Sequence, residues 1–278
     1  MTDPFVTPAW LADRLSDPTV AIVDGSWYLP AANRDPRAEY LATHIPGAIW
    51  FDVDRYSDTS TGLPHMLLGP EAFSTLAGGL GISEKMTIVV YDGMGLFSAP
   101  RVRWTFMTMG ATDVRILAGG LPAWLAEGRP TESGESTRPA TTFTARFDPA
   151  SVANLSLMRE FSNSGSRQIA DARPAARFRG EVPEPRPGLK SGHMPNAFSA
   201  PADTLVENGR LKSAETLRAQ FEAAGIDLSQ PIATTCGSGV TAATLKLALE
   251  QAGARDVILY DGSWAEWGSR DDVEVVKG

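Results

Sequence analysis

The order of short motifs in the first half of the chain recurs in the second half, and this internal repeat restricts the possible folds more than any other feature. Four landmarks appear twice in the same order, separated each time by roughly 145 residues. In the first half they are VAIVD at 20–24, HIPGA at 44–48, TIVVYD at 87–92 and GGLPAW at 119–124. In the second half they are QIAD at 168–171, HMPNA at 193–197, PIATTC at 231–236 and GSWAEW at 262–267. The chain is therefore predicted to be a tandem duplication.

Each half alternates short β-branched runs with longer amphipathic segments, which is typical of an α/β fold with a mainly parallel sheet flanked by helices. Residues 71–80 and 214–224 are predicted to be matching helices, because each ends near a glycine suited to a C-cap. The polar stretch 131–140 has no apolar periodicity and is predicted to be a linker. We expect a first domain at 1–130, a linker at 131–150 and a second domain at 151–278.

Composition and charge exclude several classes of protein. Asp and Glu number 33 against 25 Lys and Arg, whereas nucleic-acid binders usually have a basic face, so we expect no nucleic-acid partner. No apolar run approaches about 18 residues, and the start has no basic region followed by an apolar stretch, so neither a membrane span nor a secretory signal is expected. The single cysteine, Cys236, excludes intramolecular disulfides and indicates a reducing compartment such as the cytoplasm. Three scattered histidines provide no metal-ligand spacing, and no metal or other cofactor is expected.

The segment around Cys236 has the strongest functional pattern in the sequence. An expected strand at 231–235 meets a glycine-rich turn, and a helical segment begins near Thr241. Successive N–H groups at such a turn, together with the helix N-terminus, favour an anion, and Gly237 and Gly239 allow the backbone to curl. A thiol there would be stabilised as the nucleophilic thiolate. The other interpretation of a lone cysteine is a small core residue.

Two other interpretations of this loop fit less well. The spacing of Gly237, Gly239 and Ala242 resembles a dinucleotide-binding fingerprint, and Asp261 stands about 20 residues further on. Too little chain follows Asp261 to complete such a domain. A cysteine phosphatase would need an arginine six residues after Cys236 to hold phosphate bidentately, and Ala242 stands at that position.

Several motifs together resemble the two-domain sulfurtransferases of the rhodanese superfamily. They are HIPGA at 44–48, SGHMPNA at 191–197 and CGSGVTA at 236–242, and the resemblance extends from about residue 20 to residue 267. The loop is similar to that of the 3-mercaptopyruvate branch. The thiosulfate branch has two basic residues after its cysteine, where this chain has Gly237 and Ser238. A neutral loop is expected to disfavour thiosulfate, a dianion, relative to mercaptopyruvate, which has one carboxylate.

The resemblance implies a two-step cycle in which Cys236 takes sulfur from the donor as a persulfide, releases pyruvate and passes the sulfur to a thiol or to cyanide. Loop N–H groups would hold the developing charge on sulfur. The loop residues to which this role is carried over are Gly237, Gly239, Val240 and Thr241. The resemblance also assigns the donor's carboxylate to Arg177 and Arg186, because a planar guanidinium fits a carboxylate bidentately. The other interpretation of each is a mobile surface arginine.

By the same resemblance, Asp54, His65 and Ser238 form a relay that could supply a proton to the leaving group. The alternatives are that His65 is an ordinary loop residue and that Asp54 caps a helix. Asp92 stands near the cysteine's repeat position, so the first domain is expected to be catalytically silent. His44 and His193 occupy equivalent positions in the two halves, which indicates a shared structural role.

These observations and the resemblance predict a cytoplasmic 3-mercaptopyruvate sulfurtransferase with two rhodanese-like domains, of which the second is catalytic. The alternatives are a thiosulfate:cyanide sulfurtransferase on the same fold, and a binding or redox-sensing module in which Cys236 is oxidised or takes up sulfur without turnover. The expected partners are a small sulfur donor and a thiol acceptor. The resemblance suggests thioredoxin as that acceptor.

Overall fold

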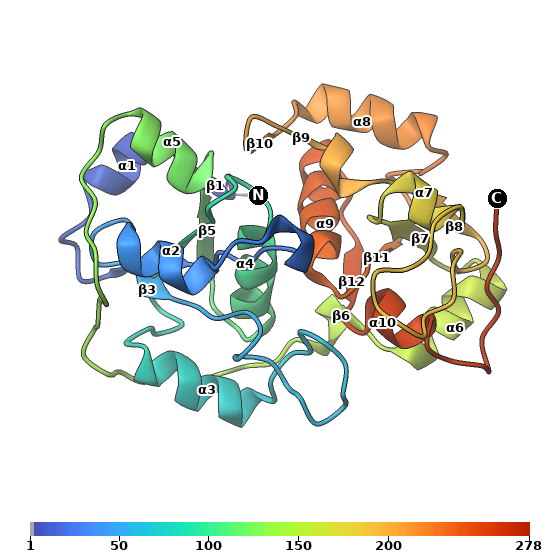
Figure 1. Ribbon diagram of the computed structural model, residues 1–278, viewed down its shortest axis with the longest axis horizontal. Coiled ribbons are helices and arrows are strands. Elements are labelled where there is room, and N and C mark those ends of the chain that lie inside the picture. Colours follow the sequence, from blue (N-terminus) through green and yellow to red (C-terminus); the bar gives the residue numbers. More distant parts are fainter. Residues whose placement is uncertain (1–2) are drawn as a thin grey trace. The chain divides into compact units, whose positions relative to one another are not determined.

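The computed structural model describes residues 3–278, which divide by their contacts into two units of similar construction (Figure 1). Within the described residues, the first unit consists of 3–57, Leu67–Asp148 and Asn208–Arg210. The second consists of Asp58–Met66, Pro149–Glu207 and Leu211–Gly278. Each unit therefore includes a short segment from the other half of the chain.

Both units contain a five-stranded parallel sheet with the same strand order. In the first, the order is β1-β5-β4-β2-β3, and in the second it is β6-β12-β11-β7-β8. The first sheet consists of β1 (Phe5–Val6), β2 (Val20–Asp24), β3 (Ile49–Trp50), β4 (Thr87–Tyr91) and β5 (Asp113–Leu117). The second consists of β6 (Val152–Ala153), β7 (Gln168–Asp171), β8 (Ala197–Ser199), β11 (Ile232–Thr235) and β12 (Val257–Tyr260). This agreement confirms the predicted duplication and the α/β class.

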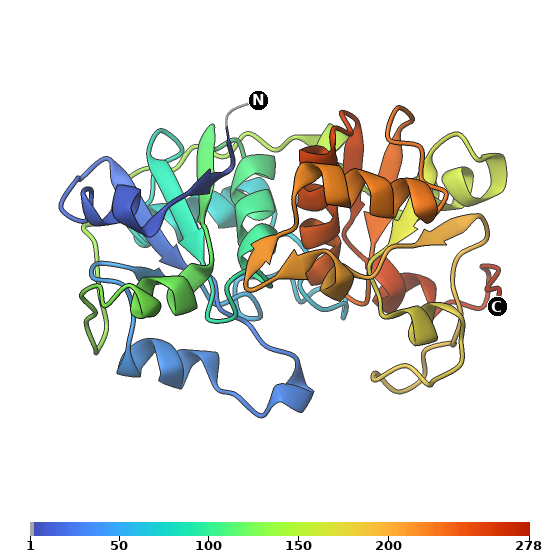
Figure 2. The same cartoon turned by 90° about the horizontal axis from the view of Figure 1, so that it is seen from above.

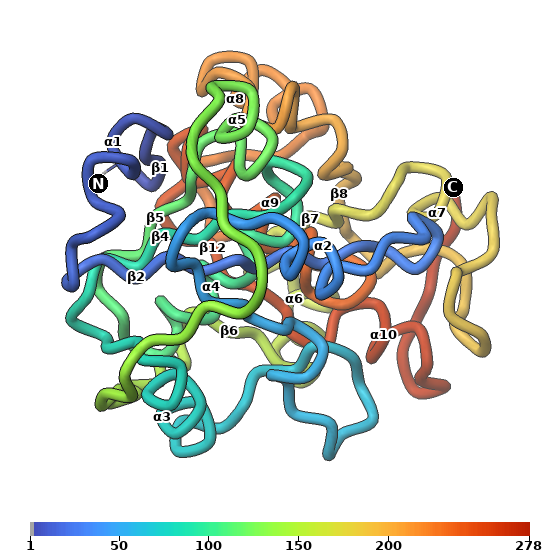
Figure 3. The backbone as a smooth tube through the Cα atoms, turned by 60° about the vertical axis from the view of Figure 1, so that its left-hand side comes forward, coloured from blue at the N-terminus to red at the C-terminus, as the bar shows by residue number. Residues whose placement is uncertain are grey.

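Helices connect the strands of each sheet, and the chain can be followed from strand to helix along the tube in Figure 3. The first unit has α1 (Pro8–Ala12), α2 (Pro36–Ala42), α3 (Pro70–Gly79), α4 (Ala99–Thr108) and α5 (Gly120–Ala126). The second has α6 (Leu155–Ser164), α7 (Ala175–Phe178), α8 (Ala214–Ala223), α9 (Val240–Ala252) and α10 (Ser263–Trp267). Short additional pieces are η1 (Pro30–Ala32), η2 (Pro149–Ser151), η3 (Ala202–Thr204) and the paired strands β9 (Val206–Glu207) and β10 (Arg210–Leu211). No helix within residues 3–278 combines the length and the apolar character that crossing a membrane requires.

Helices lie on both faces of each sheet, as Figure 2 shows, and this explains why central strands such as β11 are buried along their whole length rather than at alternate residues. All five residues of β2 are buried. On one face of the first sheet, Ile22 and Val89 pack in a core with Trp124 of α5. On the other face, Val90 lies close to Val102 of α4.

The second unit repeats this construction. Its core on one face contains Ile169, Ala233, Ile258 and two tryptophans of α10. Helix α9 covers the other face through its contacts with β11 and β12, and α8 packs against α9. Strands β7 and β11 are neighbours and run parallel, so their carboxyl ends lie at the same edge of the sheet.

The two predicted helices are present as α3 and α8, each followed by a glycine with positive φ, at Gly81 and Gly225. The stretch expected to be a linker is different. Phe143 is buried, the Arg138 guanidinium donates to the Val20 carbonyl over 3.0 Å, and residues up to Asp148 belong to the first unit. Main-chain hydrogen bonds also hold the segment against the unit, such as those from the Thr141 N–H to the Gly78 carbonyl and from the Arg146 N–H to the Met109 carbonyl. None of these contacts produces a periodic signal in the sequence.

Candidate active site

Cys236 lies at the carboxyl end of the central strand β11, in the short loop that leads into α9. The side chain is buried, with 2% exposure. The Gly239 N–H points at the thiol, 3.1 Å from Sγ, and Gly239 has a φ of 82°, which a residue with a side chain rarely adopts. In the part of the chain that the structure describes, the N–H groups of Gly237, Ser238, Val240 and Thr241 donate to no protein acceptor. The loop therefore has N–H groups to offer a developing anion.

The N-terminal end of α10 holds the main chain of this loop in place. The Cys236 N–H donates to the Ser263 hydroxyl over 3.3 Å, and that hydroxyl donates to the Tyr260 carbonyl. The next two N–H groups, of Trp264 and Ala265, donate to the carbonyls of Cys236 and Gly237. Ser263 is fully buried and has a φ of 49°, a conformation that costs energy for a residue other than glycine and is kept here by these bonds.

Two arginines converge on the first residue of the loop after the cysteine. A methyl group built on Gly237 would lie 3.3 Å from Nη2 of Arg177 and 3.9 Å from Nη1 of Arg186. Arg177 comes from α7, and Arg186 from the loop that follows it. The structure thus brings together the cysteine loop and both arginines selected from the sequence. Two guanidinium groups beside a thiol can bind an anionic donor.

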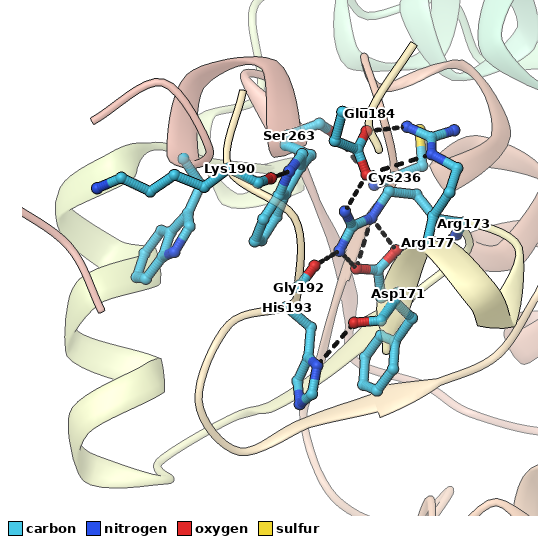
Figure 4. Close-up of polar contacts among 12 residues, drawn as sticks. Asp171, Arg173, Arg177, Glu184, Lys190, Gly192, His193, Cys236 and Ser263 are labelled. Atoms are coloured by element: carbon cyan, nitrogen blue, oxygen red, sulfur yellow. Dashed lines mark hydrogen bonds and ion pairs between the residues drawn. The ribbon is translucent and has the colours of Figure 1, made fainter. Parts of the chain in front are cut away.

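A buried network of charged side chains supports Arg177 (Figure 4). Arg173, with 1% exposure, donates to both carboxylate oxygens of Asp171 and over 2.9 Å to Oε1 of Glu184. The other oxygen of Glu184 forms an ion pair with Arg177. Burial alone disfavours the Arg173 cation, but the carboxylates of Asp171 and Glu184 outweigh that effect and raise the pKa of Arg173. The guanidinium also lies 3.9 Å above the ring of Trp264.

His65 belongs to the second unit although it precedes α3 in the chain. Its Nδ1 lies 3.2 Å from the main-chain carbonyl oxygen of Ser238, and its φ is 62°. The side chains of both residues are buried. The imidazole is therefore held at the Cys236 loop, next to Ser238, the residue with which the predicted relay pairs it.

Asp54, the third member of that predicted relay, lies in a turn of the first unit, between β3 and α3. No helix begins there, so the helix-capping alternative does not apply. Both of its carboxylate oxygens accept from the Trp27 indole N–H, at 3.1 and 3.0 Å.

The sequence was compared with families of known domains. Residues 7–127 and 155–270 both match the Rhodanese-like domain. The chain belongs to the rhodanese family. It is 43% identical to "3-mercaptopyruvate sulfurtransferase" of Escherichia coli over 272 residues, with 98% of this chain and 97% of the relative covered. It is 42% identical to the human protein of that name, covering 95% and 91% of the two chains.

Other relatives of this rhodanese-family chain extend the comparison. "Thiosulfate sulfurtransferase" of Bos taurus is 39% identical, covering 95% of this chain and 91% of the bovine one. Among solved structures, that of SseA from Escherichia coli, titled as a 3-mercaptopyruvate sulfotransferase, superposes with a TM-score of 0.88 at 41% identity, covering 95% and 99%. Sulfur transfer is the activity that the names of these relatives share, and the rhodanese-family protein is a sulfurtransferase.

In the first unit of this sulfurtransferase, Asp92 follows the central strand β4 as Cys236 follows β11. Its Oδ2 accepts from the N–H groups of Phe97, Ser98 and Ala99, at 2.7, 2.9 and 2.9 Å, and its Oδ1 accepts from that of Met94. The carboxylate itself therefore fills the ring of N–H groups at this strand end.

His44 and His193 also form equivalent contacts in the two units. Nδ1 of His44 lies 2.8 Å from the Tyr40 carbonyl oxygen, and Nδ1 of His193 lies 2.9 Å from that of Phe178. Each imidazole also stacks on the ring of the residue whose carbonyl it contacts. The ring centroids of His44 and Tyr40 are 4.2 Å apart, and those of His193 and Phe178 are 3.8 Å apart. Each histidine also forms an isolated antiparallel bridge. The equivalence fits the structural role expected for both.

Sequence reasoning missed the supports of the site: Glu184, Arg173 and Ser263. Glu184 stood two residues before Arg186 within a recognised motif, and Asp171 was only a landmark of the repeat. A signal was present in the pair Asp171 and Arg173, since two opposite charges at the end of a buried strand are costly to bury unless they pair. The partner of Ser263, 27 residues earlier in the chain, produces no local pattern.

Proposed function

We propose that the protein transfers sulfur from 3-mercaptopyruvate to a thiol or cyanide acceptor through a persulfide on Cys236. The observation that supports this most directly is the convergence of Arg177 and Arg186 on Gly237, beside a buried cysteine in a loop with free N–H groups. This arrangement suits a donor with a carboxylate near a transferable sulfur. The names of the relatives from E. coli and human point to the same donor.

In the first half-reaction, the Cys236 thiolate attacks the donor's sulfur. A sulfur–sulfur bond forms, the carbon–sulfur bond of the donor breaks, and its electron pair goes to the carbon, which takes up a proton to become the methyl group of pyruvate. The outer sulfur gives up the proton of the donor's thiol, which balances the proton gained by the methyl carbon. The negative charge left on this sulfur is stabilised by the N–H groups of Gly237, Gly239, Val240 and Thr241. In the second half-reaction, an acceptor thiolate or cyanide takes the outer sulfur and restores the Cys236 thiolate.

Arg177 and Arg186 hold the donor's carboxylate in this proposal. Two fork-shaped guanidinium groups orient a planar carboxylate better than flexible ammonium groups would. Fixing the carboxylate places the sulfur, three bonds further along the donor, at a defined distance from Cys236, which is how binding energy is converted into rate.

Ser238, His65 and Asp54 are proposed to supply the proton to the leaving group. The position of the His65 imidazole at the main chain of Ser238 supports the first two members. A histidine is suited to this transfer because an imidazole can both accept and donate a proton. We expect Ser238→Ala to slow sulfur uptake from the donor at least about 10-fold more than sulfur release from a preformed persulfide. Single-turnover measurements of the two steps test this, and equal slowing of both would contradict the assigned role.

We further propose that the first domain (1–130) is catalytically silent, since a carboxylate at Asp92 cannot take up sulfur, and that the second (151–278) carries the nucleophile. A reducing compartment such as the cytoplasm would keep Cys236 available. A small redox protein with a reactive dithiol, such as thioredoxin, would serve as acceptor because its second thiol can release the bound sulfur.

The deciding experiment is a steady-state comparison of 3-mercaptopyruvate and thiosulfate as donors with one acceptor, using Cys236→Ser as the control. Preference for 3-mercaptopyruvate, lost in the control, is the expected result. Preference for thiosulfate, an alternative that the name of the bovine relative favours, would retain the nucleophile and overturn the donor. Absence of turnover with either would favour a sensor that takes up sulfur without releasing it.

A further inference from the structure

Glu184 is the only member of the buried charge network that contacts both Arg173 and the donor-binding Arg177 among the residues that the structure describes. One carboxylate oxygen accepts from Nη1 of Arg173 at 2.9 Å and from Nε of Arg177 at 3.3 Å. The other pairs with Nη2 of Arg177. Figure 4 shows the Glu184 carboxylate between the two guanidinium groups. Its side chain is 1% exposed, so it is shielded from solvent.

The position of Glu184 is fixed by its contact with Arg173, which is itself held in place. Arg173 is held by Asp171, by the Gly192 carbonyl at 2.8 Å and by the ring of Trp264. A buried carboxylate in contact with such a fixed cation has little freedom to move, because leaving either charge unpaired would cost several kcal/mol.

Arg177 receives its orientation from this fixed carboxylate. Its side chain is 20% exposed, and a long side chain with that much freedom would lose entropy on binding a ligand. The pairing with Glu184 removes that freedom before the donor arrives, and it leaves Nη2 beside Gly237. Arg186 contrasts with Arg177, since its guanidinium has no hydrogen bond or ion pair within residues 3–278.

The same contacts set the charge that a donor meets. Asp171, Arg173, Glu184 and Arg177 contribute two negative and two positive formal charges, which cancel. Among the arginines and carboxylates of this group, Arg186 is then the one cation that no carboxylate in residues 3–278 pairs with, and it lies beside a loop whose Gly237 and Ser238 are neutral. One unpaired guanidinium matches a donor with one carboxylate better than a dianion, whose second charge would have to be desolvated without a partner.

We propose that Glu184 is a positioning residue that orients Arg177 toward the donor's carboxylate and, by offsetting its charge, favours singly charged over doubly charged sulfur donors. The role rests on the proposed function, because it requires an anionic donor at this site. Glu184 acts through Arg177 and does not itself contact the reacting sulfur.

The test is Glu184→Gln, which keeps the shape of the side chain and removes its charge. With 3-mercaptopyruvate, we expect KM to rise roughly 10-fold with a smaller change in kcat, because donor binding loses an oriented partner. With thiosulfate, kcat/KM should either rise or fall by a much smaller factor than it does with 3-mercaptopyruvate. The ratio of the two kcat/KM values should therefore shift about 10-fold or more toward thiosulfate. Attack of the acceptor on a preformed persulfide should be unchanged.

Two further variants separate this role from support of the fold. Glu181 pairs with Arg179 at the surface nearby, so Glu181→Gln removes the same charge outside the network and is expected to change nothing. Glu184→Asp keeps the charge and shortens the side chain, so it should raise KM for 3-mercaptopyruvate several-fold while the donor ratio stays constant. It also provides a test if Glu184→Gln fails to fold.

The outcomes distinguish this inference from the proposed function. If the wild type does not use 3-mercaptopyruvate, the proposed function fails first. If the wild type uses it, but Glu184→Gln lowers kcat/KM for both donors by the same factor, or Glu184→Asp leaves KM unchanged, the role of Glu184 is overturned. A lower melting temperature with unchanged KM in either variant would likewise reduce Glu184 to a support of the fold.

Discussion

The loops after the central strands β4 and β11 occupy the same place in two copies of one fold, but their main-chain N–H groups bind different partners. Seven residues, from Asp92 to Ser98, lie between β4 and α4, whereas only four, from Cys236 to Gly239, lie between β11 and α9. The longer loop curls around its own first side chain, and Asp92 accepts four main-chain N–H groups. The shorter loop aims one N–H at the Cys236 thiol and retains others for a bound group.

The comparison shows how duplication separates stability from chemistry in this molecule. A loop of N–H groups at a strand end and helix start attracts an anion in both copies. In the first unit that anion is a permanent part of the chain, so the loop contributes to stability. In the second, the proposed anion forms and disappears during the reaction, so the loop depends on outside supports such as Ser263.

The largest expected effect is the loss of activity in Cys236→Ser. Serine retains the size and the hydrogen-bonding contacts but cannot form a persulfide, so turnover should fall at least about 10³-fold, as it does when other enzymes lose their nucleophile. Stability should change little, since the loop is held by its main chain and by Ser263. Steady-state kinetics and thermal unfolding check the two halves of this prediction. Residual turnover within 10-fold of the wild type, a loss well under the ~10³ expected, would place the nucleophile elsewhere.

Two buried aspartates at equivalent strand ends, Asp24 in β2 and Asp171 in β7, should respond to the same substitution with opposite signs. Asp171→Asn removes one of the two buried carboxylates that pair with Arg173, and breaking such a buried pair costs about 3–5 kcal/mol of stability. Asp24 contacts Ser26 instead of a cation, and burial raises the pKa of its carboxyl from 3.8 to about 6. Asp24→Asn is therefore expected to stabilise the protein at pH 8.

The pH dependence identifies the cause of this second effect. Because the pKa of Asp24 is higher in the folded than in the unfolded state, folding binds a proton between pH 3.8 and about 6. The free energy of unfolding should thus fall as the pH rises through that window, by about 3 kcal/mol for this shift. Asp24→Asn should lack that decline. Denaturant unfolding at pH 4 and pH 8 measures it, and parallel declines in variant and wild type would contradict the prediction.

The third effect concerns stability in the first loop. Asp92→Ala removes the acceptor of four N–H groups at a position with 1% exposure, and water can satisfy only some of them. We expect the free energy of unfolding to fall by about 2–4 kcal/mol. Asp227→Ala is the matched control, because Asp227 accepts the Ser229 N–H in an exposed turn and its loss should matter far less. Equal effects of the two substitutions would show that the Asp92 carboxylate is not what holds the loop.

The sequence is sufficient to predict the parts of the molecule that depend on local pattern or on repetition. Strand residues such as 87–91, the helix after Cys236 and the equivalence of His44 and His193 are visible because period, glycine position and repeat order are local properties. The choice of Cys236 follows the same logic, since a strand end, a glycine-rich turn and a helix start are all read from neighbouring residues.

The parts that the sequence does not reveal depend on which distant side chains meet. Glu184 became a partner of Arg173 and Arg177 only because β7, α7 and the following loop fold back on one another. Residues 58–66, which carry His65, are counted with the second unit although they precede most of the first, and no periodicity marks that exchange. Asp92 could be recognised as a poor nucleophile from its type alone, but its four N–H partners required the loop's conformation.

The smallest effect tests the two loops at the glycine that follows Asp92 or Cys236. In Gly237→Ala, the new methyl group would meet only the ends of the Arg177 and Arg186 side chains, at 3.3 and 3.9 Å, and these can shift. We expect KM for the donor to rise roughly 3- to 10-fold with little change in stability, because the arginines move slightly off the donor's carboxylate.

In Gly93→Ala, the methyl group would overlap the hydroxyl of buried Tyr28, which Glu39 and Arg34 hold at 2.7 and 2.8 Å. That overlap should cost about 1–2 kcal/mol of stability and leave KM unchanged. The pair thus assigns binding to one loop and structure to the other, and the opposite pattern, a KM effect from Gly93→Ala or a stability loss from Gly237→Ala alone, would contradict the division between the two copies.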